Sequence, residues 1–222
     1  MKYKFMGHYG LLPPWRLEPR MIPLPEESTA LFKSVNASAG SKSIPEWTDF
    51  FRGRRLSLEP NSTHRIEVEF QVYMTAFLRL VIENQNRPGS SVKFTYSEAY
   101  ENPAAPYASR KTVRTAREGN VLRGPSDSYH FSGSKETGKT EIFEPFWWKA
   151  FRFIVIDISV GNEPLHLLEF LANQTNYPIN ETASWEDISD PQGAKMMEIS
   201  VRTMRMCMFD GYSDCPFYEQ LQ

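Results

Sequence analysis

The stretch His64-Arg65-Ile66-Glu67-Val68-Glu69-Phe70 alternates between apolar and charged residues. In an extended chain its apolar members, Ile66, Val68 and Phe70, fall on one face and its charged members on the other. This period of two is typical of a strand that buries one face. The stretch therefore predicts a half-buried β-strand.

Outward from this strand, similar segments recur between clusters of Asn, Gly, Pro and Ser, which are turn signals. They are Ala30–Val35, Arg55–Leu58, Phe77–Glu83, Ser91–Tyr100, Ser126–Phe131, Phe151–Val160 and Leu165–Leu171. Many strands without interleaved helices predict an antiparallel, jelly-roll-like β-sandwich rather than βαβ units. We expect this domain over residues 28–187, after a proline-rich N-terminal arm over residues 1–27.

After Trp185 the period becomes helical, which predicts a linking α-helix in a third region, residues 188–222. Asp190-Pro191 has the pattern of an N-cap followed by proline at the first helical position, and Gly211 that of a C-terminal stop. One apolar stripe runs along this helix: Met197, Val201, Met204 and Met208. We interpret the stripe as a packing face that other helices must cover, so we expect the chain alone to be poorly soluble.

The composition excludes several function classes. The chain has 222 residues, 41% of them hydrophobic, and a net charge of −2, which gives no reason to expect nucleic-acid binding. No apolar run approaches the roughly 18 residues of a membrane span, and no signal peptide opens the chain. Two cysteines cannot make a disulfide framework, and Cys215 is interpreted as a small packing residue. No cofactor or metal site is expected.

Four N-glycosylation sequons begin at Asn36, Asn61, Asn173 and Asn180. They favour an extracellular protein whose N-terminus lies upstream of Met1, and the localisation stays open.

The terminal motif Asp214-Cys215-Pro216-Phe217-Tyr218-Glu219 places two carboxylates five residues apart around a turn. Glycoside hydrolysis needs a protonated acid and a second carboxylate as base or nucleophile. Near a helix start, Glu219 could be that acid only if burial or a neighbouring negative charge kept it protonated, and Asp214 could supply the charge or bind a sugar hydroxyl. Alternatively, Asp214 caps a helix and Glu219 is a solvated acid of its first turn.

The order of these landmarks resembles the α-L-rhamnosidases of glycoside hydrolase family seventy-eight over some 160 residues. The motif Asp-Cys-Pro-x-x-Glu, after a sandwich and a linking helix, is similar to the start of that family's catalytic domain. Further similar stretches are Leu56–Glu98, Phe94–Tyr100, Asp127–Tyr129, Phe143–Phe146 and Phe151–Phe153. Phe217 and Tyr218 stand where family members often have polar residues.

The resemblance implies an inverting exo-glycosidase that releases terminal α-L-rhamnose, with Glu219 as general acid and Asp214 as a substrate contact. It implies that the sandwich is followed by an (α/α)6 six-hairpin barrel, of which this chain holds only the truncated start. That missing barrel would be the partner of the sandwich, and it would carry the general base. We therefore expect an N-terminal fragment that is inactive alone, whose parent acts on rhamnose-containing glycosides. The aglycone, the linkage, the deoxysugar itself and the oligomeric state stay open.

The alternative function is a non-catalytic carbohydrate-binding or structural β-sandwich module. Trp147 and Trp148 could form a sugar-stacking platform, but as neighbours on a strand they would point to opposite faces, which favours core and interface roles. The basic stretch Arg110–Arg117 is interpreted as a solvated hairpin or loop rather than a phosphate site.

Overall fold

The computed structural model describes residues 19–111, 113–133, 139–184, 190 and 192–219. Within them the fold is mainly β, as the sequence predicts. The elements are β1 (Glu26–Thr29), β2 (Phe32–Ala39), α1 (Ile44–Phe51), β3 (Leu56–Leu58), β4 (Thr63–Glu83), β5 (Ser91–Ser97), β6 (Tyr100–Glu101), a 3-10 turn (Tyr107–Ser109), β7 (Val121–Leu122), β8 (Ser126–His130), β9 (Thr140–Phe143), β10 (Lys149–Ser159), β11 (Leu165–Asn176) and α2 (Gly193–Cys207).

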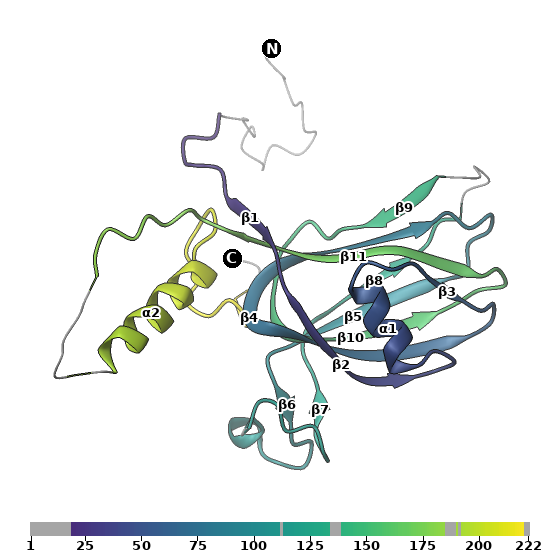
Figure 1. Cartoon of the computed structure of the whole chain (residues 1–222), viewed down its shortest axis with the longest axis horizontal. Helices are drawn as coiled ribbons and strands as arrows, with labels where there is room; N and C mark the ends of the chain where they lie inside the picture. Colours follow the sequence, from purple (N-terminus) through teal and green to yellow (C-terminus); the bar gives the residue numbers. More distant parts are fainter. Residues whose placement is uncertain (1–18, 112, 134–138, 185–189, 191, 220–222) are drawn as a thin grey trace, which may run out of the picture.

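Nine strands form one antiparallel sheet in the order β1-β11-β4-β10-β5-β8, to which β2, β3 and β9 add further pairings. The first half of β4 pairs with β2 and β10, and its second half pairs with β9 and β11, while β10 also follows β4 past the midpoint to Ala76. The sheet curls, so that the two halves of β4 belong to opposite layers (Figure 1). The rings of Phe94 on β5 and Phe170 on β11 meet across the layers with centroids 6.2 Å apart.

The bend in β4 corrects one prediction. His64–Phe70 and Phe77–Glu83 were expected as separate strands, but they are parts of one 21-residue strand. Met74 pairs with Phe151 and Glu69 pairs with Phe153. On the β10 side, four residues of β4 (70–73) therefore lie opposite the single residue Arg152. No Gly or Pro interrupts the strand there, so the chain bends through this bulge instead of breaking.

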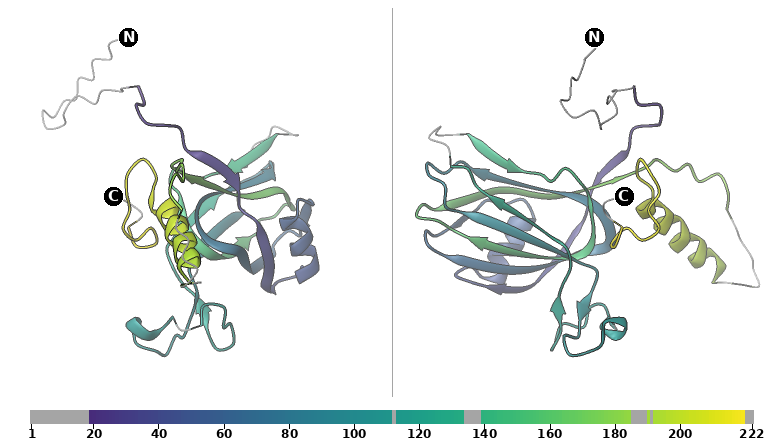
Figure 2. Two further views of the ribbon diagram at one scale, coloured as in Figure 1. Left: turned by 60° about the vertical axis from the view of Figure 1, so that its left-hand side comes forward. Right: turned by 180° about the vertical axis from the view of Figure 1, so that it is seen from behind.

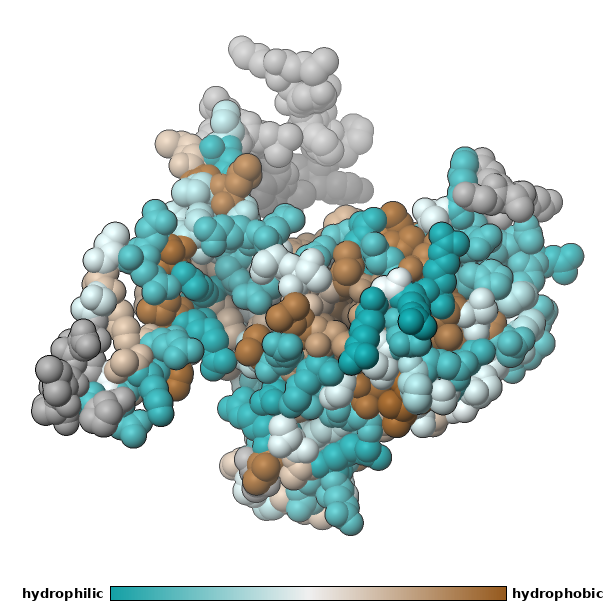
Figure 3. Space-filling model, viewed as in Figure 1, coloured by the Kyte–Doolittle hydropathy of each residue, from teal (hydrophilic) through white to brown (hydrophobic). Residues whose placement is uncertain are grey.

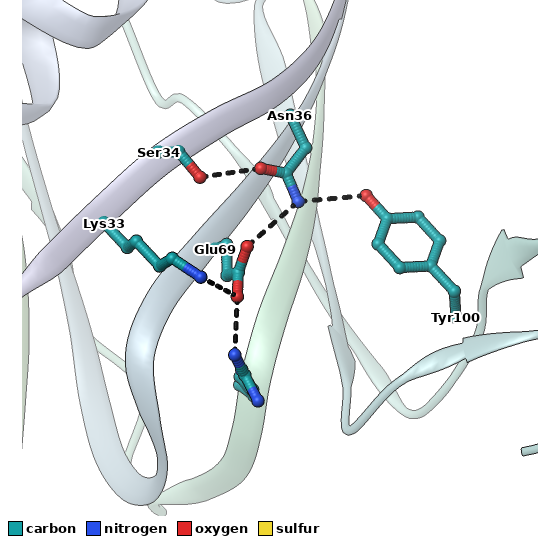
Figure 4. A network of polar contacts seen from close by, with 6 residues as sticks. Lys33, Ser34, Asn36, Glu69 and Tyr100 are labelled. Carbon is teal, nitrogen blue, oxygen red and sulfur yellow. Dashed lines mark hydrogen bonds and ion pairs between the residues drawn. The ribbon is translucent and has the colours of Figure 1, made fainter. Parts of the chain in front are cut away.

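The apolar face of the first predicted strand is buried as expected, with Ile66 and Val68 fully inaccessible. Its charged face differs from expectation, because Glu69 is only 5% exposed. Lys33 and Arg152 donate to its carboxylate at 2.9 and 2.7 Å, and the Asn36 amide donates at 3.4 Å (Figure 4). These bonds satisfy a carboxylate that could not otherwise be buried.

Asn36 carries the first sequon, and Figure 4 shows its amide inside this network. The amide also donates to the Tyr100 hydroxyl at 3.3 Å and accepts from the Ser34 hydroxyl at 2.7 Å. A glycan on the Asn36 nitrogen would replace one of its two N–H groups, so the amide could no longer donate to both Glu69 and Tyr100. The exposed Asn61 and Asn180 have no such constraint.

Helix α1 contradicts the prediction that no helix interrupts the strands. Ser43 and Glu46 form a capping box, with Pro45 in the first turn. The helix buries Trp47, Phe50 and Phe51 against the main core. The Ser-x-x-Glu signal was present in the sequence, but the segment is only eight residues long and its apolar period is short.

Helix α2 lies to one side of the sandwich (Figure 2). The prediction of Asp190 as N-cap is wrong, because the helix begins at Gly193 with Gln192 as its N-cap and no side-chain cap bond. Asp190 lies just before that start and accepts the backbone N–H of Gln192 at 3.0 Å, while Pro191 lies outside the described residues. The predicted stop at Gly211 is wrong. The helix ends at Cys207, because Met208 is extended and forms an isolated β-bridge with Tyr212.

The predicted stripe of α2 is only partly covered by the described residues. Met197, Val201 and Met208 are half-buried and Met204 is 53% exposed, whereas Met206, off the stripe, is buried. Hydrophobic atoms are visible over α2 in Figure 3. The packed end of α2 is fastened to the sandwich by the Asn176 amide, which donates to the Arg205 carbonyl at 2.7 Å.

Candidate functional site

The terminal segment (residues 208–219) folds back toward the sandwich after α2. The Ser213 N–H donates to the Cys207 carbonyl at 2.8 Å, which closes the loop. Proline at 216 then starts a single turn, in which the N–H groups of Tyr218 and Glu219 donate to the Cys215 carbonyl at 3.0 and 2.9 Å. The predicted turn around Pro216 is therefore present.

The carboxylate of Glu219 points back at the start of this turn. Its Oε2 accepts the backbone N–H of Asp214 at 2.9 Å and that of Cys215 at 3.2 Å. The carboxylate thus satisfies free N–H groups at the start of the turn, as a capping side chain does at a helix start. Glu219 is half-buried and the Asp214 side chain is exposed. The structure thus places the two predicted site residues in one turn, with Glu219 rather than Asp214 as the capping side chain.

An aromatic cluster holds the turn against the sandwich. Phe217 is buried beside Trp148 and Ala150, and Phe209 packs against both tryptophans at 5.8 to 6.0 Å. The prediction that Trp147 and Trp148 point to opposite faces of a strand is wrong. They precede β10, and their rings stack on each other with centroids 5.7 Å apart. In the described structure they form a docking surface for the terminal segment.

Lys111 links the turn to the segment between β5 and β8, here called the β6–β7 excursion (residues 98–125). Its ammonium donates to Glu98 Oε2 at 2.5 Å and to the Tyr218 hydroxyl at 2.9 Å. It also lies over the Phe217 ring, 4.8 Å from the centroid. Burial acts to lower the pKa of Lys111, but the hydrogen bonds to Glu98 and Tyr218 outweigh it and raise that pKa, so the residue stays charged.

Tyr73 continues this contact into the sandwich. Burial, followed by the charge of the neighbouring Glu98 carboxylate, raises the pKa of the Tyr73 phenol, so the phenol stays protonated. Tyr73 lies in the bend of β4 and packs against the cluster that contains Phe217. The bulge therefore adjoins the terminal turn, which Lys111 joins to the excursion. The described residues of the basic stretch Arg110–Arg117 form a loop as predicted, but Lys111 within it is only partly solvated, because its side chain is 27% exposed and paired with Glu98. Its four-in-eight basic pattern could not indicate which residue turns inward.

The described residues hold no cluster of three or more His, Cys, Asp or Glu side chains suited to a metal ion. Cys207 and Cys215 are free thiols of intermediate exposure. In the described part of the chain, neither helix has the length and apolar character needed to cross a membrane.

Neither a protein-family model nor a curated protein matches this sequence. Among solved structures, the GH78 family rhamnosidase of Bacillus sp. GL1 is similar over 75% of this chain and 15% of its own, with a TM-score of 0.51 and 20% identity. A rhamnosidase from Klebsiella oxytoca with rhamnose bound is similar over 88% of this chain and 38% of its own, with a TM-score of 0.53 and 13% identity. A CBM32 module of AlyQ in complex with 4,5-unsaturated mannuronic acid is similar over 64% of this chain and 97% of its own, with a TM-score of 0.35 and 15% identity.

At these identities the two rhamnosidases show a shared β-fold and nothing more specific. The chain spans about 15% and 38% of their lengths. The neighbours thus include both glycosidases and carbohydrate-binding modules.

Proposed function

We propose that this chain is the N-terminal part of an inverting exo-glycosidase that releases terminal α-L-rhamnose from glycosides. The observation that carries the proposal is the seating of Asp214–Glu219 directly against the sandwich, through the buried Phe217 and the Lys111–Tyr218 bond. The shared fold with two rhamnosidases supports it, as does the similarity of the Asp-Cys-Pro-x-x-Glu motif to that family.

In this proposal Glu219 protonates the glycosidic oxygen as the bond breaks, and Asp214 binds a hydroxyl of the rhamnose that is released. A second carboxylate must activate the attacking water, and we assign none among the described residues. It would come from a helical barrel in the whole protein. The contacts of Glu219 with the N–H groups of Asp214 and Cys215 would orient its carboxylate and leave Oε1 for the substrate.

The test compares aryl α-L-rhamnosides whose leaving groups differ in acidity, using the whole gene product that contains this chain. A general acid matters most for a poor leaving group. Glu219→Gln should therefore lower kcat on a phenyl rhamnoside by about 10²- to 10⁴-fold and leave the dinitrophenyl rhamnoside nearly unaffected. Asp214→Asn should lower the rates on both substrates by a similar factor. If Glu219→Gln lowered kcat equally on both substrates, Glu219 would not be the general acid and would keep only its capping role.

The 222-residue chain alone should show no measurable turnover on either substrate. Turnover that disappears in Glu219→Gln would show that the chain also holds the base.

A non-catalytic carbohydrate-binding or structural module is the second candidate, and the capping geometry of Glu219 favours it. In that case the whole gene product would have no rhamnosidase activity, and Glu219→Gln would change stability alone.

A further inference from the structure

A groove with a volume of about 660 Å³ lies between the β6–β7 excursion, the start of β8 and the terminal turn. Its walls include Tyr107 and Arg110 from the excursion, Arg123 just before β8, and Tyr218 from the terminal motif. The volume is in the range of small-molecule sites. The predicted roles of the terminal motif do not account for this groove, nor for the aromatic pair Phe217-Tyr218.

The groove carries more cations than carboxylates. Four basic and two acidic residues line it: Arg110, Lys111, Arg123, Lys149, Glu101 and Asp127. Two of the cations have acidic partners. Lys111 pairs with Glu98 and lies 3.6 Å from Glu101, and Lys149 lies 3.8 Å from Asp127.

Two guanidiniums remain. Arg110 donates from Nε to the Ala105 carbonyl at 3.1 Å and lies over the Tyr107 ring at 5.7 Å, while Arg123 is exposed. Within the described residues, neither has a carboxylate within ion-pair distance. A guanidinium presents paired N–H donors that match a carboxylate, so Arg110 and Arg123 are suited to a ligand with that group.

The remaining walls are aromatic. Tyr107 is 72% and Tyr218 is 58% exposed, and burial of Phe217 behind them keeps Tyr218 at the groove edge. Lys111 donates to the Tyr218 hydroxyl at 2.9 Å. Exposed rings beside hydrogen-bonding groups provide an apolar surface and polar contacts at once, a combination that suits a sugar ring.

We propose that this groove binds a carboxylate-bearing saccharide, with its acid group on Arg110 and Arg123 and its ring against Tyr107 and Tyr218. This rests on the proposed function in one respect: the acidic sugar would then be the part of the substrate beyond the cleaved bond, since Tyr218 directly precedes Glu219. The binding itself requires no hydrolysis.

The experiment is calorimetric titration of the 222-residue chain with trigalacturonate, and with the same trisaccharide after methyl esterification. The ester keeps the shape of the ligand and removes its charge. Arg110→Gln/Arg123→Gln is the test variant, and Arg55→Gln/Arg87→Gln is the matched control, because it removes two exposed arginines outside the groove. Tyr107→Ala tests the ring contact, and inorganic sulfate is a third ligand.

We expect saturable binding of the acid that is at least about tenfold tighter than that of the ester, a difference of about 1.4 kcal/mol. The test variant should lose a similar factor, the control none, and added salt should weaken binding. Tyr107→Ala should also weaken binding of the trigalacturonate. No saturable binding, equal binding of acid and ester, or an unaffected test variant would overturn the proposal. Displacement by sulfate together with an unaffected Tyr107→Ala would reduce the groove to a simple anion site and also overturn it.

Failure here is distinguishable from failure of the proposed function, because the titration does not depend on Glu219. If the kcat loss of Glu219→Gln did not depend on the leaving group, the catalytic role of Glu219 would be refuted, but the binding result would be unaffected.

Discussion

The carboxylate of Glu219 accepts the backbone N–H of Asp214 at 2.9 Å, so the two acidic residues of the terminal motif are parts of one hydrogen-bonded turn. Their separation of five residues follows from that turn, since a carboxylate at the end of the first turn reaches the free N–H groups at its start. A catalytic role for Glu219 must therefore be compatible with this structural one.

Glu219→Ala should loosen the turn locally. The N–H groups of Asp214 and Cys215 lose their acceptor, and loss of a cap costs about 1 kcal/mol. Amide hydrogen exchange read by NMR should show faster exchange at these two positions, with the sandwich unchanged. Glu219→Gln keeps an acceptor oxygen and should have a smaller effect. Unchanged exchange in Glu219→Ala would mean that these bonds do not form in solution.

Lys111→Met should destabilise the chain more than an exposed charge removal does. Glu98 is 14% exposed and would lose its cation, and an unsatisfied partly buried polar group costs about 1–3 kcal/mol. Urea unfolding measures the change. Arg54→Met is the control, because its ion pair with Asp49 is largely exposed and should contribute about 0–1 kcal/mol. A double-mutant cycle with Glu98→Gln should show coupling between the two residues, and additive effects would argue against a stabilising Lys111–Glu98 ion pair.

Gly124→Ala should separate the excursion from the terminal segment. A Cβ there would lie 1.7 Å from the Tyr96 carbonyl oxygen and 3.2 Å from the Phe217 ring, so backbone must move. We expect a loss of about 1–3 kcal/mol, as for overpacked positions, and a change in the fluorescence of Trp147 and Trp148. Gly211→Ala is the matched control, because nothing lies within 4 Å of its added Cβ. Equal stability of the two variants would contradict the close approach.

Acidification should weaken the fold through His64. Burial, and secondarily the charge of Lys42, lowers the pKa of this buried imidazole. The unfolded chain then binds a proton more readily than the folded one, so this contribution is complete above the ordinary histidine pKa of about 6.5 and is lost as the pH falls below it. Urea midpoints at pH 7.5 and 5.5 test this. The His64→Leu variant should be less stable at pH 7.5, but its stability should change less between the two pH values. An unchanged pH dependence in this variant would exclude His64 as the source of the effect.

Most of the β-structure could be predicted from the sequence, because burial of one sheet face imposes a period of two, as in His64–Phe70. What could not be predicted was where strands join or end. Phe77–Glu83 continues β4 because a bulge absorbs the bend, and α2 ends at Cys207 because Met208 bridges Tyr212. The capping box of α1 was readable, but a short helix leaves little periodicity.

For the candidate site, the sequence by itself determined the two carboxylates and the turn at Pro216, because proline and capping chemistry act within a few residues. The cap that Glu219 forms on the N–H of Asp214 spans five residues and is local too. Only the tertiary structure decided that Trp147 and Trp148 stack on each other and pack against Phe209, and that Lys111 meets Tyr218 from 107 residues away. The physical reason is that local hydrogen bonds depend on near neighbours. Burial and charge pairing depend on which distant segments the folded sheet brings together.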